Sequence, residues 1–132
     1  MTRIPLTLLV PLVALVIGAC GGGDEADPDQ VVRDFVTATD AKDAERLCEE
    51  ILTRAYISQA TGAEEGDTGS CKRQLAAVEG LDLALVRIVR TTEDGDKAEV
   101  RAVIRLQGQR QRRIFRLERE DGDWKVAGGT AG

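Results

Sequence analysis

The three cysteines are the residues of this chain with the clearest chemistry, because the sequence contains no histidine. Cys20 follows an apolar run, residues 4–17, which is preceded by a single charged residue, Arg3. A helix of these residues would be about 21 Å long, well short of the roughly 30 Å hydrocarbon core of a bilayer. The layout therefore predicts a signal peptide at 1–19 that directs export, rather than a membrane-spanning helix.

The residues that follow this run, Ile17-Gly18-Ala19-Cys20, resemble the lipobox of bacterial lipoproteins. The resemblance implies that Cys20 is acylated, becomes the mature N-terminus and anchors the chain to the extracytoplasmic side of the cell membrane. Residues 20–27 are glycine-rich and acidic, which predicts a flexible tether between the lipid and the folded domain. We therefore expect a lipid-anchored envelope protein, with the membrane as its first partner.

Cys48 and Cys71 remain as an even pair in an exported protein, which favours a disulfide between them. Two unpaired buried cysteines are the alternative. Their spacing matches no metal-binding signature, and a zinc site of the Cys/His kind is excluded without histidine. We expect neither a metal site nor a cofactor.

No catalytic set emerges from the remaining polar residues. Tyr56 is the only phenol, and carboxylates such as Asp40 and Asp43 fall at expected helix starts. The sequence also lacks a nucleophile elbow and a phosphate-binding glycine loop. These observations favour a non-enzymatic binding or accessory module over the alternative, a cavity enzyme with a buried carboxylate of raised pKa that acts on a small apolar molecule.

Apolar residues recur at helical spacing in the first part of the domain and alternate in the second. The pattern predicts helices at 28–39, from 40 or 43 to 58, and at 71–79. Strands are expected at 82–91, 97–107, 110–120 and 124–127, and the short turns between them require antiparallel pairing. The expected fold is α+β, with three N-terminal helices packed on a curved four-stranded antiparallel meander, a domain at 28–127 and a flexible tail at 128–132.

This domain resembles the nuclear-transport-factor-2-like superfamily, in which a curved sheet wraps around helices to form a cone. The resemblance rests on the opening helix VVRDF at 31–35, the order of helices before meander, and the closing strand DGDWKV at 121–126. Cystatin-like packing around one long helix is the nearest alternative fold. The superfamily's cone can hold a pocket, and its enzymes include isomerase- and cyclase-like members.

A pocket between the first two helices and the concave face of the sheet would have Tyr56, Arg113 and Trp124 as its candidate lining. Arg113 shares a strand face with Phe115 and Leu117, and an inward arginine is costly unless it meets a partner. The expected ligand is therefore a small amphiphile with an anionic end.

Arginines on the outward face of the strands are the other candidate site: Arg101, Arg105, Arg112 and Arg116. They could form a basic patch for anionic lipid headgroups, wall polymers or an acidic envelope protein. Pairing with Glu99 and Glu118 across the strands is the more ordinary expectation. The charge of the whole chain, −5, argues against a nucleic-acid partner.

Overall fold

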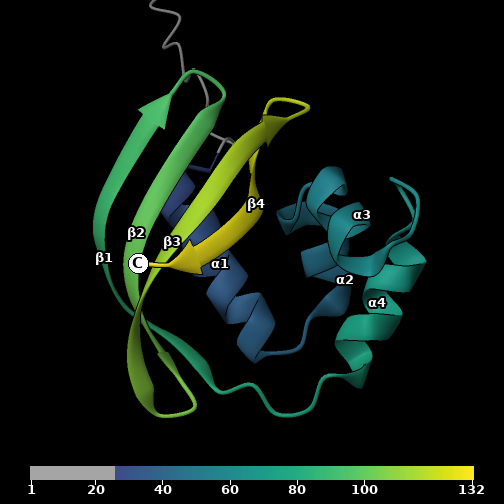
Figure 1. Ribbon diagram of the computed structural model, residues 1–132, viewed down its shortest axis with the longest axis horizontal. Coiled ribbons are helices and arrows are strands. Elements are labelled where there is room, and N and C mark those ends of the chain that lie inside the picture. Colours follow the sequence, from purple (N-terminus) through teal and green to yellow (C-terminus); the bar gives the residue numbers. More distant parts are fainter. Residues whose placement is uncertain (1–25) are drawn as a thin grey trace, which may run out of the picture.

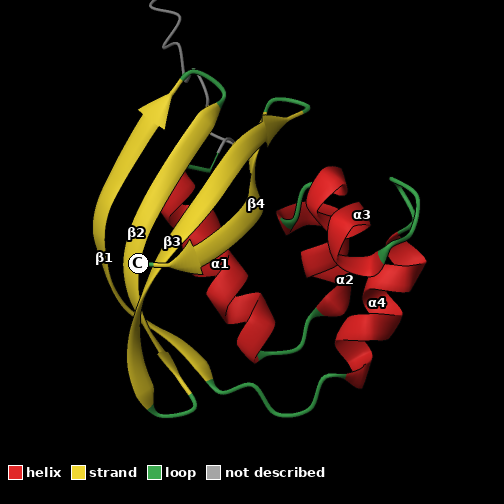
Figure 2. Cartoon of the chain, in the orientation of Figure 1, coloured by secondary structure: helices red, strands yellow, loops and turns green. Residues whose placement is uncertain are grey.

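The computed structural model describes residues 26–132, so the expected signal peptide, Cys20 and most of the tether lie outside the described residues. Helices precede strands, as predicted, and the four strands form one open antiparallel sheet in the order β1-β2-β3-β4 (Figures 1 and 2). No helix among residues 26–132 is long and apolar enough to cross a membrane. The elements are α1 Pro28–Asp40, α2 Ala44–Arg46, the π-helical turn η1 Leu47–Ile51, α3 Arg54–Thr61, α4 Thr68–Ala77, β1 Leu83–Asp94, β2 Lys97–Leu106, β3 Gln109–Glu120 and β4 Asp123–Ala131.

Helix α1 lies across one face of the sheet, while the other helices gather beside β4 (Figure 1). Its apolar stripe, which includes Val32 and Val36, is buried against the strands. Polar contacts fix both of its ends to β1. The hydroxyl of Thr91 donates to Asp29 in the first turn, and the backbone N–H of Leu83 donates to the carboxylate of Asp40 at 3.0 Å.

The single helix expected up to residue 58 is wrong, because the chain is extended at Leu52 and Thr53. Leu52 forms a parallel bridge with Val126 of β4, and the N–H of Thr53 donates to the Val126 carbonyl at 3.0 Å. The Thr53 side chain then caps α3 by accepting from the N–H of Tyr56. A contact with a distant strand therefore overrides the local helical pattern.

The third expected helix, α4, begins earlier than predicted because the Asp67 side chain caps it by accepting from the N–H of Ser70. Its Cys71 forms a disulfide with Cys48 of η1, with the two α-carbons 6.0 Å apart. The predicted bridge is thus confirmed in the structure. It joins η1 to α4 within the helical layer, the name used here for α1, α2, η1, α3 and α4 together.

The register of the sheet divides its residues between two faces. On the face that packs on α1, Val100 of β2 lies opposite Phe115 of β3, and Ala98 lies opposite Leu117. All four are buried. The opposite face carries most of the charged residues of the strands and is called here the outer face.

The flexible tail expected at 128–132 is also wrong, since β4 continues to Ala131. Ala127 is an extra residue at a bulge, so that Leu117 pairs with Val126 while the preceding Arg116 pairs with Gly128. A side chain at Gly128 would place its β-carbon 2.6 Å from a guanidinium nitrogen of Arg116. Gly128, the first residue of the expected tail, is instead a strand residue beneath the Arg116 side chain.

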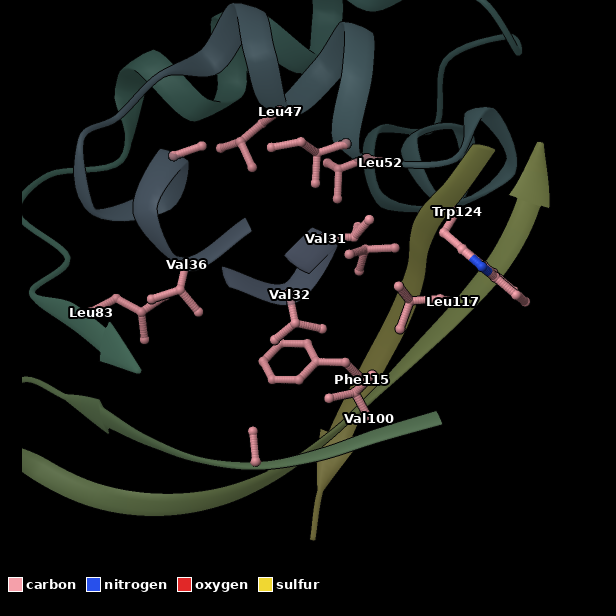
Figure 3. Close-up of a cluster of buried hydrophobic side chains, with 14 of the residues drawn as sticks. Val31, Val32, Val36, Leu47, Leu52, Leu83, Val100, Phe115, Leu117 and Trp124 are labelled. Atoms are coloured by element: carbon pink, nitrogen blue, oxygen red, sulfur yellow. The ribbon is translucent and has the colours of Figure 1, made fainter. Parts of the chain in front are cut away.

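The hydrophobic core fills the space between α1 and the sheet (Figure 3). Val32 and Val100 are fully buried at 0 % exposure. The rings of Phe35 and Phe115 meet edge to face, with centroids 5.6 Å apart. Side chains therefore fill the part of the domain in which the expected cone could hold a pocket.

Candidate functional site

The three residues predicted to line one pocket lie in different surroundings. Trp124 of β4 is buried, and the Arg119 guanidinium carbon lies 4.3 Å from its ring centroid. Arg113 shares the inner face with Phe115 as expected, but it donates to the side-chain oxygen of Gln111 at 2.8 Å. No two of Tyr56, Arg113 and Trp124 line the same hollow among those described below.

Tyr56 borders a mostly apolar hollow of about 200 Å³, called here the helical hollow. Its walls come from α1, η1, α3 and α4, with no strand residue among them: Phe35, Thr39, Leu47, Leu52, Tyr56, Ile57, Ala60, Thr61, Cys71, Gln74 and Leu75. The hollow therefore lies within the helical layer and not against the concave sheet. None of these residues is a carboxylate, so the hollow lacks the buried acid that the cavity-enzyme alternative requires.

A larger groove of about 470 Å³ runs between α3 and the end of the outer face beside the hairpin between β1 and β2, and Tyr56 also borders it. Its strand residues carry both signs of charge, since Lys97 and Arg116 lie among Asp94, Glu99 and Glu118. A third hollow of about 400 Å³ includes Trp124 and likewise mixes acidic and basic residues. Neither the groove nor the third hollow therefore presents charges of a single sign to a ligand.

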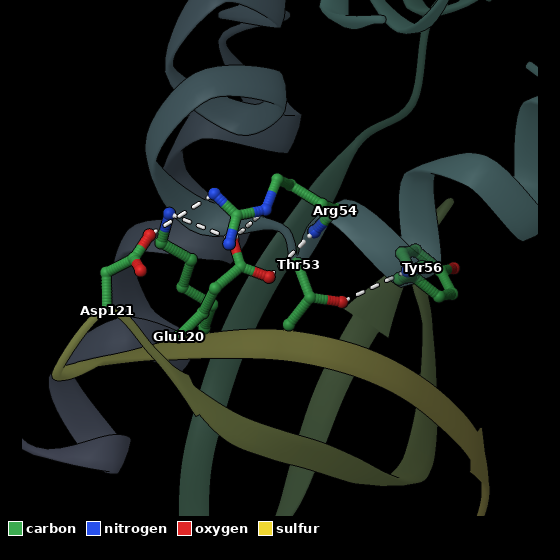
Figure 4. A network of polar contacts seen from close by, with 6 residues as sticks. Thr53, Arg54, Tyr56, Glu120 and Asp121 are labelled. Carbon is green, nitrogen blue, oxygen red and sulfur yellow. Dashed lines mark hydrogen bonds and ion pairs between the residues drawn. The ribbon is translucent and has the colours of Figure 1, made fainter. Parts of the chain in front are cut away.

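A polar cluster joins the start of α3 to the turn between β3 and β4 (Figure 4). The Glu120 carboxylate accepts from the backbone N–H of Arg54 at 3.0 Å and from Lys125 at 3.5 Å. The Arg54 guanidinium reaches Asp121 at 3.2 Å. These contacts hold the helical layer against the sheet, so we assign the cluster a structural role.

Several acids of the helical layer likewise have structural partners. Asp40 holds the start of β1, Asp43 accepts from the N–H of Arg46, and Asp67 caps α4. The ammonium of Lys72 lies 2.6 Å from Glu49, and this hydrogen bond raises the pKa of the lysine above 10.5. Within residues 26–132 no group of three or more metal-ligating side chains is close enough to hold an ion.

The outer face, by contrast, carries arginines with no acidic neighbour in the register. Three successive cross-strand rows toward the hairpin between β2 and β3 contain Arg90 with Arg101, Arg87 with Arg112, and Arg105 with Arg110. We call these six residues the arginine face. All six are exposed, and none forms an ion pair with another residue of the described part of the chain.

The expected pairing with Glu99 and Glu118 does not occur in these rows. Glu118 lies between Lys97 and Lys125, and Glu99 lies between Thr92 and Arg116. Of the four arginines predicted to face outward, Arg116 therefore has an acid opposite it. The other three belong to the arginine face.

Two β-bulges in β1 complete this face. Arg87 and Arg90 are three residues apart, so strict alternation would send their side chains to opposite sides of the sheet. Register shifts between Leu85 and Arg87 and between Ile88 and Arg90 place both on the outer side. Sequence reasoning missed these two residues for that reason, whereas Arg110 could have been found from its alternation with Arg112.

The arginine face includes direct like-charge neighbours. Arg90 lies opposite Arg101, and Arg105 lies opposite Arg110. Like charges directly opposite in an antiparallel pair are destabilising, and arginine cannot lose its charge at accessible pH. This arrangement lowers the stability of the fold and gives the surface a positive charge that attracts anions.

No protein-family model and no curated protein matches the chain. Among solved structures, it is similar to a SEC-C motif containing protein from Rhodopseudomonas palustris, with a TM-score of 0.50 and 20 % identity over 80 % of this chain and 78 % of that one. At this identity the likeness concerns the fold alone. A de novo designed protein with a curved β-sheet has a TM-score of 0.43, 19 % identity and coverage of 78 % and 96 %. A designed protein with NTF2 in its name has a TM-score of 0.43, 12 % identity and coverage of 80 % and 100 %.

Proposed function

We propose that this chain is a lipid-anchored envelope protein with a nuclear-transport-factor-2-like domain, and that it binds an anionic partner without catalysis. The observation that carries the proposal is the arginine face, three successive rows of the sheet with six arginines and no acid. The lipobox-like residues that end at Cys20 support the anchor, and the helices followed by an antiparallel meander support the fold.

Arginine is suited to this role because its planar guanidinium binds carboxylate or phosphate through two parallel hydrogen bonds. The six side chains stand exposed and without an ion-pair partner in the described chain, so binding does not have to break existing ion pairs. An anionic partner would also remove the repulsion between Arg90 and Arg101, which lie directly opposite each other. The same contacts would then bind the partner and reduce the charge repulsion within the sheet.

The test compares two variants of the full acylated chain in a neutral detergent. The face variant replaces Arg101, Arg105 and Arg112 with Gln. The control variant replaces Arg33, Lys42 and Arg73 with Gln, which removes the same charge from exposed positions in the helical layer. We expect the face variant to elute from an immobilised polyanion at much lower salt than the wild type, while the control elutes close to the wild type. Equal elution of the two variants would contradict the proposal.

The helical hollow favours a second candidate function, binding of a small amphiphile. Its walls are mostly apolar, and Tyr56 stands between it and the charged groove beside α3. A ligand could place its apolar part in the hollow and its polar end in the groove. Calorimetry with medium-chain fatty acids tests this function: Ala60→Phe at the wall of the hollow should abolish binding, whereas Ala76→Phe at an exposed position of α4 should not.

A further inference from the structure

We infer that the anionic partner of the arginine face is a phospholipid surface, and that the domain docks with its sheet flat on the membrane that holds its anchor. The inference rests on the proposed function and names the partner of the same site. Four features of the structure favour a lipid surface over a single ligand or an acidic protein.

The first feature is the spread of the charges. Rows on one face of a strand are about 7 Å apart, and neighbouring strands are about 4.8 Å apart. The six arginines therefore cover a patch of about 14 by 10 Å. The hollow between Arg90 and Arg101, of about 250 Å³, also contains Glu99 in its wall and so is not a closed site for one anion. A plane of many phosphates can engage all six residues at once, whereas a small anion cannot.

The second feature is the apolar surface among the arginines. Val89, at the second bulge of β1, is 57 % exposed and directly precedes Arg90. Val103, which is buried, and Ile114, which is half-buried, occupy the outer positions between the arginines of β2 and β3. An exposed apolar side chain such as Val89, beside basic side chains, suits the boundary between headgroups and acyl chains. An acidic protein surface would leave Val89 without an apolar environment.

The third feature is the opposite charge of the two layers. Residues 20–80, which contain every helix of the described residues 26–132, hold 14 acidic and 6 basic side chains. Glu45, Glu49 and Glu50 are exposed on that side of the molecule. An anionic membrane repels this layer and attracts the arginine face. The domain is thereby oriented with the sheet toward the lipid.

The fourth feature is the place where the tether joins the domain. Asp29, in the first turn of α1, accepts a hydrogen bond from Thr91, the residue after Arg90. The tether therefore enters on the inner side of β1, the strand whose outer side carries Arg87 and Arg90. A flexible segment of eight residues spans about 16 Å on average, which keeps the face close to the surface that holds the lipid. At such an effective concentration, contacts that are individually weak suffice for docking.

The experiment uses the full acylated chain reconstituted into vesicles, with an environment-sensitive dye on a cysteine introduced by Val89→Cys. The native Cys48–Cys71 disulfide is buried and leaves the new thiol as the reactive one of the domain. Ala76→Cys, at an exposed position of α4, carries the same dye as the control for the helical layer. Phosphatidylcholine vesicles are compared with vesicles that also contain phosphatidylglycerol.

We expect the dye at position 89 to shift to the blue in the phosphatidylglycerol vesicles alone, and the dye at position 76 to stay unchanged in both. High salt should reverse the shift. The face variant should lower the equilibrium constant for docking about a hundredfold, because each basic residue near an anionic surface contributes roughly a factor of five. The control variant should dock as the wild type does.

Three results overturn the inference. A shift of equal size in both vesicles would show that the tether alone sets the environment of position 89. No shift in either vesicle, with retention on the polyanion still lost in the face variant, would contradict a lipid partner but leave the proposed function standing. No shift in either vesicle, together with equal elution of the face variant and the control variant from the polyanion, would refute the inference and the proposed function together.

Discussion

Within residues 26–132, basic and acidic side chains meet in ion pairs at several points of the helical layer, but not on the arginine face. In the helical layer, Arg46 pairs with Asp34 at 3.4 Å and Lys72 pairs with Glu49 at 2.6 Å. On the arginine face, Arg90 and Arg101 lie opposite each other and have no acidic partner in the described chain. Paired charges contribute to the fold, whereas unpaired like charges reduce its stability. The contrast therefore separates residues that hold the domain together from residues available to a partner.

The largest expected effect breaks the covalent link of the helical layer. Replacing both Cys48 and Cys71 with Ala should lower the free energy of unfolding by about 2 to 5 kcal/mol, because the disulfide limits the unfolded chain. Urea unfolding under non-reducing conditions measures the change. The wild type with reductant provides the control and should lose a similar amount. An unchanged unfolding midpoint in the variant would show that the bridge does not form in solution.

The next effect concerns the polar cluster between the layers. Glu120→Ala should lower the free energy of unfolding by about 1 to 3 kcal/mol, because it leaves the N–H of Arg54 and the ammonium of Lys125 without their acceptor. The Glu120 side chain is 14 % exposed, so water replaces it only in part. Glu118→Ala, on the exposed outer face of the same strand, is the matched control and should change stability by less than about 0.5 kcal/mol. Equal effects would contradict the structural role of the cluster.

Elements whose pattern is local could be predicted from the sequence. Strict alternation and short turns gave β2 and β3 to within one residue at each end. The break at Leu52 and Thr53 could not be predicted in this way, because it depends on pairing with Val126, more than seventy residues along the chain. A threonine that can cap a helix was the available local signal at Thr53.

The candidate site follows the same division. Arg101, Arg105 and Arg112 could be placed on one face because β2 and β3 alternate without interruption. Arg87 and Arg90 join them through bulges, which no pattern of polar and apolar residues in β1 reveals. The missing acidic partners also depend on register, since the sequence alone allows Glu99 and Glu118 to lie beside any of these arginines.

A third prediction concerns the arginine face, where a substitution should raise the stability of the fold instead of lowering it. Arg101→Thr should raise the free energy of unfolding by about 0.2 to 1 kcal/mol, because it removes the repulsion with Arg90 and places a residue of high strand propensity in β2. Arg119→Thr is the control: it should lower stability by about 0.5 to 1 kcal/mol, since it removes the cation from the face of Trp124. Thermal unfolding at low salt measures both. A stability loss for Arg101→Thr would show that this arginine has a structural role after all.

The smallest effect tests a paired charge of the helical layer through pH. In the folded state the pKa of Lys72 is raised above 10.5, first through the hydrogen bond to Glu49. A raised pKa means that the pair stabilises the fold fully below 10.5 and that this contribution is lost as the pH rises through the higher, folded-state value. Lys72→Met should therefore be less stable than the wild type at neutral pH, and the difference should disappear above the raised pKa. Lys97→Met, in β2, is the control for the general effect of alkali on the fold. A Lys72→Met difference that stays constant across the alkaline range would mean that the side chain acts through packing and not through its charge.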